Sequence, residues 1–300
     1  MKSRLVASVA ALLAFCPRAG AEDSAPGLNG IEAVASKVAP DYIREKQPDG
    51  TFKTEFYAFG KGGDWGGPIK DDSIDKVDFM DVARTIAPAL AGQQYAPARD
   101  PKTTKLLVMV YWGTTTVPQP YENDPLYQAY YQALEEYHLL LSGIPPQVDE
   151  ANAVLTAGLH QLEIENHIRD RLDFKNAGML GYDMSGLIGT ERGNYLSHTA
   201  LRTERNDEVD EIEANRYFVV LMAYDFQLLM KSKKHKLLWA ARFSINELHN
   251  QFDKALPAMA QYASKYFGQP SNGLIRERLL NPDVKIGEPT LIQFLGDEKK

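Results

Sequence analysis

The chain has one cysteine, Cys16, which lies in an apolar stretch near the amino end. If that stretch is cleaved on export, the mature chain has no thiol. Disulfide bonds, thiolate nucleophiles and thiolate zinc sites are then excluded, so the core alone must stabilise the fold. Positive charge is also scarce, with 33 Lys and Arg against 40 Asp and Glu and a net charge of −7. The chain lacks the basic field that attracts phosphate backbones, so we expect no nucleic-acid partner.

Long apolar runs are absent too. The run from Leu5 to Phe15 has eleven residues, short of the roughly 20 that span a bilayer. Lys2 and Arg4 stand near its start, and the small residues Ala19-Gly20-Ala21 follow it. This order is typical of a secretory signal peptide, which we place at residues 1–21. We therefore expect an exported bacterial protein, periplasmic or secreted, with no transmembrane segment after the signal is removed.

The surroundings of Cys16 argue against a lipid anchor. Phe15 precedes it, where lipid-attachment sites have a small residue, and Pro17 follows it. We therefore do not expect lipid anchoring.

The length allows one large globular domain or two small ones, and the absence of repeats and linkers favours one domain with a helical subdomain. The 300 residues are 44% hydrophobic and 24% charged, which is ordinary globular usage. We find no repeat of 20–50 residues and no low-complexity linker. The predicted organisation is a leader over 22–50, one domain over 51–268 and a tail over 269–300.

The first half of that domain has the pattern of a β-α-β unit. Residues 51–59 carry four aromatic side chains with Thr and Lys between them and follow the turn signal Pro48-Asp49-Gly50, as a strand does. Residues 106–112 form an unbroken apolar run typical of a buried strand. A helix capped by Asp78 lies between them. We expect the two strands to be parallel neighbours joined by a right-handed crossover. In the leader, 31–38 is predicted to be a short helix.

The second half begins with a helical insertion over 124–174. Asp124 and Pro125 are typical of a helix start, and a second helix is predicted from Val148 to Phe174. A long glycine-containing loop is expected over 175–203. The remaining elements are an acidic helix at 204–214, an antiparallel hairpin of 216–229 with 237–245, and a helix at 252–267. The predicted fold class is α+β: a four-stranded mixed sheet in the order β-α-β, helical insertion, β-β-α, with helices mainly on one face.

A hairpin carrying Ala223-Tyr-Asp225 and Lys236-Leu-Leu-Trp239, after a short helix and an apolar strand, resembles the small α+β domains of uncharacterised bacterial envelope proteins, both periplasmic and lipoprotein-like. The resemblance covers about half of the chain. It implies an envelope location and no activity.

The loops that follow the two parallel strands are the first candidate site. Parallel strands bring 60–72 and 113–123 to one edge of the sheet, where α/β proteins bind ligands. Aromatic and hydroxyl side chains there suit a small neutral ligand such as a sugar or a peptide. The candidate ligand-binding residues are Asp64, Trp65, Thr114, Thr115, Thr116 and Tyr121. The alternative is an ordered glycine-rich surface loop closed by a tryptophan.

A weak metal candidate lies in the insertion. His160, Glu163 and His167 fall on one helical face, although residues seven apart are about 10.5 Å apart along the axis, too far for one ion without another ligand. A solvated polar stripe explains the same pattern. We therefore expect no metal and no cofactor.

Catalysis has no motif here. Ser185 lacks the Gly-x-Ser-x-Gly elbow, and nothing in the sequence brings His198, His249 and Asp225 together. We name no catalytic residue.

Four tyrosines of the insertion, Tyr127, Tyr130, Tyr131 and Tyr137, form a stripe. Such a stripe is typical of a core between two helices, or of a protein-binding face if it is exposed.

Three functions stay open. The first is a non-catalytic envelope protein that binds another protein or a peptide. The second is a periplasmic module for a small neutral ligand at the strand-end loops. The third is a hydrolase without a recognisable motif.

Overall fold

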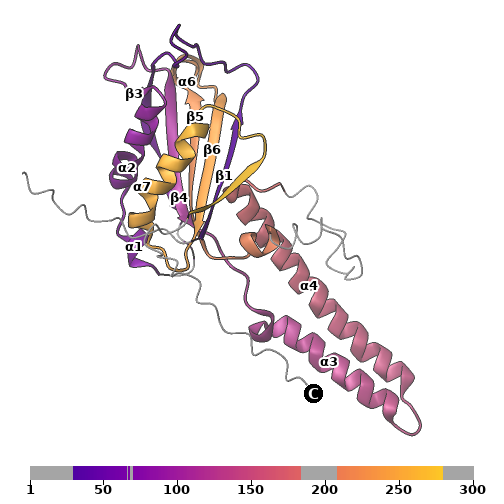
Figure 1. Ribbon diagram of the computed structural model, residues 1–300. Helices are drawn as coiled ribbons and strands as arrows, with labels where there is room; N and C mark the ends of the chain where they lie inside the picture. Colours follow the sequence, from indigo (N-terminus) through magenta and orange to yellow (C-terminus); the bar gives the residue numbers. More distant parts are fainter. Residues whose placement is uncertain (1–29, 66, 68–69, 184–207, 280–300) are drawn as a thin grey trace, which may run out of the picture.

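The computed structural model describes residues 30–65, 67, 70–183 and 208–279 (Figure 1). The strands are β1 (Gly30–Val38), β2 (Glu55–Trp65), β3 (Tyr95–Pro97), β4 (Leu106–Thr114), β5 (Arg216–Asp225), β6 (Leu237–Asn246) and β7 (Leu274–Leu279). The helices are α1 (Asp72–Asp75), α2 (Phe79–Gly92), η1 (Tyr121–Asn123), α3 (Pro125–Ser142), α4 (Val148–Leu180), α6 (Phe226–Ser232), α7 (Phe252–Ala263) and η3 (Ser264–Tyr266). The strands form one mixed sheet in the order β3-β2-β4-β5-β6-β1-β7, within an α+β architecture.

The parallel pair expected from the sequence is present. β2 and β4 run side by side in the same direction, with Tyr57 opposite Leu106 and Trp65 opposite Gly113. α2 lies on the crossover between them. It starts at Asp78, which forms a reciprocal capping box.

The prediction of a four-stranded sheet is wrong, because the sheet has seven strands. β1 occupies the segment predicted as a helix at 31–38, and β7 lies in the predicted tail. β1 pairs antiparallel with both β6 and β7. Because β1 is covered on both faces, its sequence lacks the apolar–polar alternation of a half-exposed strand. β3 has only three residues, which is too short for an alternation of apolar and polar side chains to mark it as a strand in the sequence.

The two faces of the sheet are covered differently. α1, α2 and α7 lie across one face, and the carboxyl end of α4 packs on the other (Figure 1). Trp112, Trp239, Phe243 and Phe267 are large members of the core under α2 and α7. A smaller core joins the end of α4 to β1 and β5; it contains Ala33, Ala177, Met179, Leu180, Tyr182, Ile212, Phe218 and Val220.

The helical insertion forms as predicted but is longer. The Asp124 carboxylate accepts hydrogen bonds from the backbone N–H groups of Leu126 and Tyr127, and Pro125 opens α3. α4 continues to Leu180 instead of ending at Phe174, so the predicted loop begins later than expected. α3 and α4 form an antiparallel hairpin that projects away from the sheet (Figure 1).

The predicted β5–β6 hairpin is confirmed, with antiparallel pairing from Arg216 opposite Asn246 to Tyr224 opposite Leu237. β5 ends before the predicted boundary at residue 229. The Asp225 carboxylate accepts a hydrogen bond from the Leu228 N–H at 2.9 Å and caps α6.

Several predictions fall outside the described residues: the signal peptide 1–21 with Cys16, the leader up to residue 29, 184–203 of the predicted loop, Ser185 and His198 within it, and 280–300 of the tail. Of the acidic helix predicted at 204–214, residues 208–212 are helical. Within the described ranges, no helix, not even the 33-residue α4, is both long and apolar enough to cross a membrane.

A close backbone contact joins β2 and β4 at their carboxyl ends. A Cβ added to Gly113 would lie 2.1 Å from the carbonyl oxygen of Trp65. The partner atom belongs to the backbone of a paired strand, so it cannot move aside without breaking the pairing. Glycine is therefore required at residue 113 for this register.

We expect Gly113→Ala to lower the free energy of unfolding by about 2–4 kcal/mol, because the added methyl group separates the two strands. The matched control is Gly92→Ala at the end of α2, where an added Cβ meets no atom within 4 Å. The control should leave stability unchanged or raise it by up to about 1 kcal/mol. Urea denaturation followed by circular dichroism measures both. Equal stabilities of the two variants would show that the strand contact imposes no constraint.

Candidate functional site

The six ligand-binding residues predicted at the ends of the two parallel strands do not all lie together in the structure. Asp64 and Trp65 end β2, opposite Trp112 and Gly113 of β4. The Trp65 side chain is 46% exposed and packs on Tyr111 with a centroid distance of 5.5 Å. Trp65 therefore lies at the surface, at the edge where the sequence analysis placed a ligand.

The threonines that follow β4 hold the fold together. The Thr115 hydroxyl donates to the carbonyl oxygen of Ala214 at 2.8 Å and accepts from the Arg216 N–H at 2.9 Å. The Thr116 N–H donates to Oδ1 of Asn176 at 3.3 Å, and the Thr116 carbonyl oxygen accepts from Nδ2 of Asn176 at 2.9 Å. Thr114 and Thr115 are buried. A ligand-binding role of this edge stays a prediction.

Tyr121 lies at the base of the α3–α4 hairpin. The Arg169 guanidinium carbon is 3.7 Å from the centroid of the Tyr121 ring. The same ring lies 4.5 Å from the ring of Tyr127 on α3. These contacts join Tyr121 to α3 and α4.

The metal candidate is an exposed polar stripe on α4. The Glu163 carboxylate lies 3.7 Å from Nδ1 of His160 and 4.0 Å from Nε2 of His167, and all three side chains are about two-thirds exposed or more. In the part of the chain that the structure describes, no group of three His, Cys, Asp or Glu side chains could hold a metal ion.

The histidine and aspartate considered for catalysis are far apart. Asp225 ends β5 and caps α6, whereas His249 follows the far end of β6. Because β5 and β6 are antiparallel neighbours, these residues lie at opposite ends of the hairpin.

Sequence reasoning missed a cluster of Asp71, Ser73 and Tyr217. The Tyr217 hydroxyl donates to the Asp71 carboxylate, and the Ser73 hydroxyl lies 3.0 Å from the same carboxylate. Burial, together with this bond to Asp71, raises the pKa of Tyr217 above its usual value. Ser73 also accepts from the Phe252 N–H at 2.9 Å. The cluster caps α1 and ties it to β5 and α7, which is a structural role.

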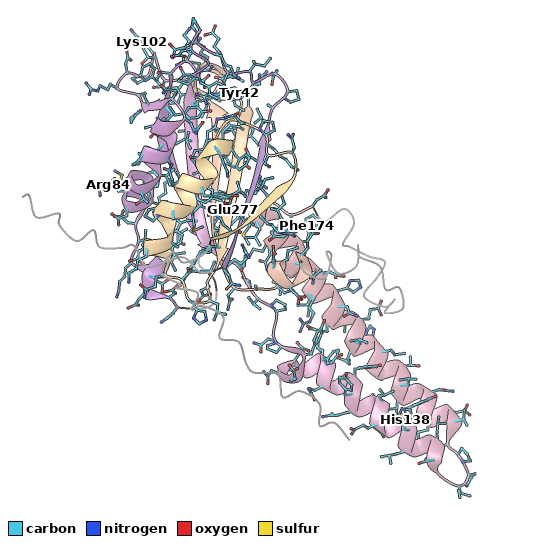
Figure 2. The ribbon with its side chains drawn as sticks, viewed as in Figure 1. Tyr42, Arg84, Lys102, His138, Phe174 and Glu277 are labelled. Carbon is cyan, nitrogen blue, oxygen red and sulfur yellow. The ribbon has the colours of Figure 1, made fainter. Side chains whose placement is uncertain are left out.

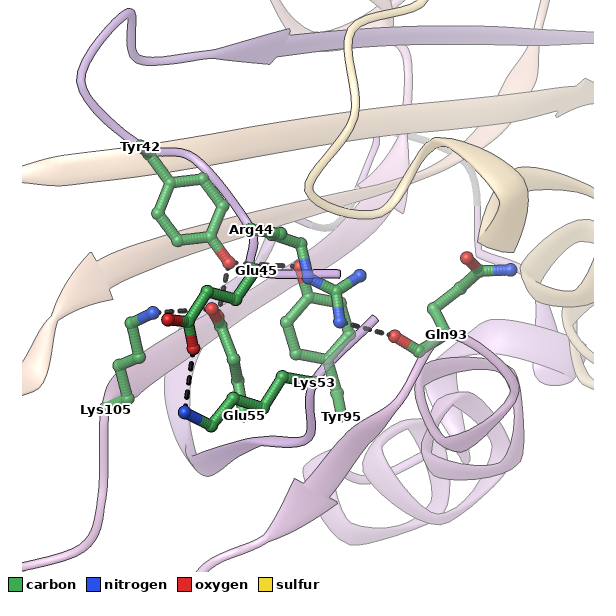
Figure 3. Close-up of polar contacts among 8 residues, drawn as sticks. All are labelled: Tyr42, Arg44, Glu45, Lys53, Glu55, Gln93, Tyr95 and Lys105. Carbon is green, nitrogen blue, oxygen red and sulfur yellow. Dashed lines mark hydrogen bonds and ion pairs between the residues drawn. The ribbon is translucent and has the colours of Figure 1, made fainter. Parts of the chain in front are cut away.

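A second polar cluster lies at the amino ends of β2 and β3 (Figure 3). The buried Glu55 carboxylate accepts hydrogen bonds from the Tyr42 hydroxyl and the Lys105 ammonium, each at 2.5 Å. Tyr42 also contacts the hydroxyl of Tyr95 at 3.2 Å. Burial, then Tyr95 and Glu55, raises the pKa of Tyr42, so its phenol stays protonated and donates. This closed network anchors residues 42–55 to the sheet.

The Arg44 guanidinium extends this second cluster. It is sandwiched between Phe52 and Tyr95, 4.1 Å from each ring centroid. It also donates to the carbonyl oxygen of Gln93 at 2.7 Å (Figure 3). Arg44 therefore ties the segment before β2 to the turn after α2.

Glu32 on β1 is a buried carboxyl group with no hydrogen-bond partner among the described residues. Burial, followed by repulsion from Glu277 on the neighbouring β7, raises its pKa to about 9. The group is therefore protonated at neutral pH. It was not found from the sequence, because nothing marked 31–38 as a strand.

A buried ion pair within α4 lies at the base of the α3–α4 hairpin. Nε of Arg169 lies 2.7 Å from the Glu165 carboxylate, and both side chains are less than 5% exposed. Arg169 also donates to the carbonyl oxygen of Gln119. Burial, then the nearby Asp124 carboxylate, raises the pKa of Glu165. The Arg169 side chain on α4 therefore fixes the segment that connects β4 to α3.

The two helices pack closely along their length. A Cβ added to Gly158 on α4 would lie 2.5 Å from the Cβ of Ala133 on α3. The backbones therefore approach more closely here than larger side chains would allow. Despite this contact, no residue of α3 is fully buried.

The predicted tyrosine stripe lies along this contact and extends to the surface. Tyr127, Tyr130 and Tyr137 are half-buried, and Tyr131 is exposed. The rings of Tyr127 and Tyr131 meet at 4.9 Å between centroids. Part of the stripe therefore packs between the helices, as a core would, and part of it faces solvent, as a binding face would.

The hairpin exposes many large apolar side chains, and Figure 2 shows side chains along both of its helices, with His138 near the distal end. Eight of the 16 exposed large apolar residues in the described ranges belong to it: Tyr131, Leu139, Ile144, Val148, Leu159, Ile164, Ile168 and Phe174. A gathering of exposed large apolar side chains on one part of a fold is typical of sites that bind other proteins. We take the hairpin as the candidate functional site.

Comparisons with known proteins add little. No protein-family model and no curated protein matches the chain. Among solved structures, a PDZ domain protein from Parabacteroides distasonis ATCC 8503 has a TM-score of 0.35 and 10% identity. The match covers 83% of this chain but only 39% of that structure. It supports no statement about function.

We expect Glu32→Gln to change how stability depends on pH. Between the ordinary Glu pKa of 4.5 and about 9, folded Glu32 holds a proton that the unfolded chain has released, so stability falls as pH rises. The variant loses this slope. The free energy of unfolding of the variant should match that of the wild type near pH 5 and exceed it by roughly 2–4 kcal/mol at pH 8, as measured by urea denaturation.

The control for this experiment is Glu277→Gln, which removes the second cause of the shift and keeps the first. It should retain most of the pH slope, because burial is the larger cause. A wild type whose stability is level from pH 5 to pH 8 would contradict the assignment.

Proposed function

We propose that this protein binds another protein through the α3–α4 hairpin, and that it does so in the bacterial envelope after export. The observation that carries the proposal is the exposure of apolar side chains along the hairpin. Ile144 at the turn is 100% exposed, Leu139 is 71% exposed and Phe174 is 60% exposed. A helical arm that served only its own fold would bury such side chains between its helices or against the sheet.

The packing of the hairpin supports this proposal. The contacts of Arg169 with Gln119 and Tyr121 at the base, and the close approach at Gly158, hold the two helices in one arrangement. A preorganised surface loses less conformational entropy on binding than a flexible one. The arm can therefore present its apolar side chains to a partner without first becoming ordered.

The energy available is sufficient for a specific complex. Full burial of an exposed Leu, Ile or Phe side chain contributes about 1.5–3 kcal/mol. A micromolar complex corresponds to about 8 kcal/mol after the costs of association are met. Several of the eight exposed side chains would have to be buried together, as they are when two helical surfaces meet.

The location is proposed from the sequence of residues 1–21. The positive start, the short apolar run and the Ala19-Gly20-Ala21 site are the features that support export. A partner would then be another protein of the periplasm or the cell surface.

Site-specific photo-crosslinking tests the binding surface. A photoreactive amino acid replaces Ile164 on α4 in the full chain, expressed in the bacterium that encodes it; the control places it at Arg84 on α2, which is also exposed (Figure 2). We expect discrete protein adducts from residue 164 and none from 84, because only the hairpin contacts the partner. An equal pattern from both positions, or no adduct from either, would contradict the proposal.

Export is tested on the same full chain. We expect the mature protein in the periplasm or the medium, with a mass that shows cleavage after Ala21. Leu12→Arg with Leu13→Arg places charge in the apolar run and should leave the uncleaved chain in the cytoplasm, whereas Lys2→Arg should be processed normally. Cytoplasmic wild-type protein that retains residues 1–21 would refute export.

A further inference from the structure

We infer that the partner presents a basic amphipathic segment to the distal end of the hairpin, an inference that depends on the proposed function. The site is the tip patch, which we define as Leu139, Ile144 and Val148. These side chains are 71%, 100% and 51% exposed. The Gln147 N–H donates to the carbonyl oxygen of Leu140 at 3.1 Å, so the end of α3 and the start of α4 meet here.

Acidic side chains surround the tip patch. Glu135 and Glu136 lie one helical turn before Leu139 on α3, at the i−4 and i−3 positions that share its face. Asp149 and Glu150 follow Val148 in the first turn of α4. All four acidic side chains are exposed.

The distal part of the hairpin supplies no lysine or arginine to balance these acids. Between Lys105 and Arg169 the sequence contains no Lys or Arg, so the whole distal hairpin carries only negative formal charge. Arg169 itself is buried in its pair with Glu165. Among the residues that the structure describes, the tip patch is therefore an apolar surface with an acidic rim and no counter-charge from the distal hairpin.

This charge selects among possible occupants. A second copy of the chain would bring a second acidic rim against the first, and anionic lipid headgroups would be repelled in the same way. A protein segment with apolar side chains flanked by Lys or Arg complements both features. Apolar burial would supply affinity, and the charges would supply orientation and speed of association.

A pair of designed peptides tests this inference on the full chain. Both are 18-residue helices with leucine on one face; one carries lysine on the flanks and the other carries glutamate in the same places. Binding is measured by fluorescence anisotropy at low and high salt. We expect the lysine peptide to bind at least about 10-fold more tightly than the glutamate peptide, and to weaken as salt rises.

Variants locate the binding. Leu139→Ser with Ile144→Ser should weaken the lysine peptide by about 10-fold or more, and Glu135→Gln with Glu136→Gln by about 5-fold. The matched control, Asp72→Asn with Asp253→Asn, removes the same charge from exposed positions on the sheet domain and should change affinity less than about 2-fold. The altered side chains are exposed, and circular dichroism checks that each variant is folded.

Three outcomes would overturn the inference. The two peptides bind equally or neither binds; the control variant weakens binding as much as the tip variants; or the protein forms a dimer that Leu139→Ser with Ile144→Ser abolishes, which would identify a second copy as the occupant. Adducts from residue 164 in the crosslinking experiment, together with any of these outcomes, would leave protein binding by the hairpin intact and remove only the basic partner.

Discussion

The amide of Asn176 joins three parts of the chain that are distant in sequence. Its side chain bonds to the backbone of Thr116 after β4 and donates to the carbonyl oxygen of Ile212 before β5 at 3.1 Å. Asn176 is fully buried, so each of these bonds satisfies a group that water cannot reach. Through this one side chain, the carboxyl end of α4 is fixed to the segments that flank β4 and β5, two neighbouring strands near the centre of the sheet.

The direction of the hairpin follows from that attachment. The carboxyl end of α4 packs on the sheet, and the hydrogen bond from Arg169 to the carbonyl oxygen of Gln119 then fixes the connection that leads from β4 to α3. Beyond this point the main packing of each helix, among the described residues, is against the other. The small residues Gly158 and Ala133 bring them close, which leaves the larger apolar side chains on the outer surfaces. Both proposals depend on two features: the fixed attachment of the carboxyl end of α4 to the sheet, and the exposed apolar and acidic side chains of the distal hairpin.

Polar groups buried elsewhere serve the sheet. The Tyr42–Glu55–Lys105 network anchors the segment before β2, and the Asp71–Tyr217 contact anchors α1. Glu32 differs from both, because its buried carboxyl group has no hydrogen-bond partner among the described residues and remains protonated near neutral pH. Its burial lowers stability as the pH rises above the ordinary Glu pKa.

Local patterns in the sequence determined the elements whose signals are complete within a few residues. The Asp124-Pro125 start of α3, the parallel pairing of β2 with β4 and the β5–β6 hairpin were all predicted, because capping chemistry and apolar runs are local. Only the tertiary structure decided the rest. β1 and β7 pair across more than 200 residues, and Thr115, Thr116 and Asn176 acquire their roles from partners far along the chain. The exposure of Leu139 and Ile144 is of the same kind: whether an apolar side chain is covered depends on which surfaces the fold brings to it, and this is not encoded at any single position.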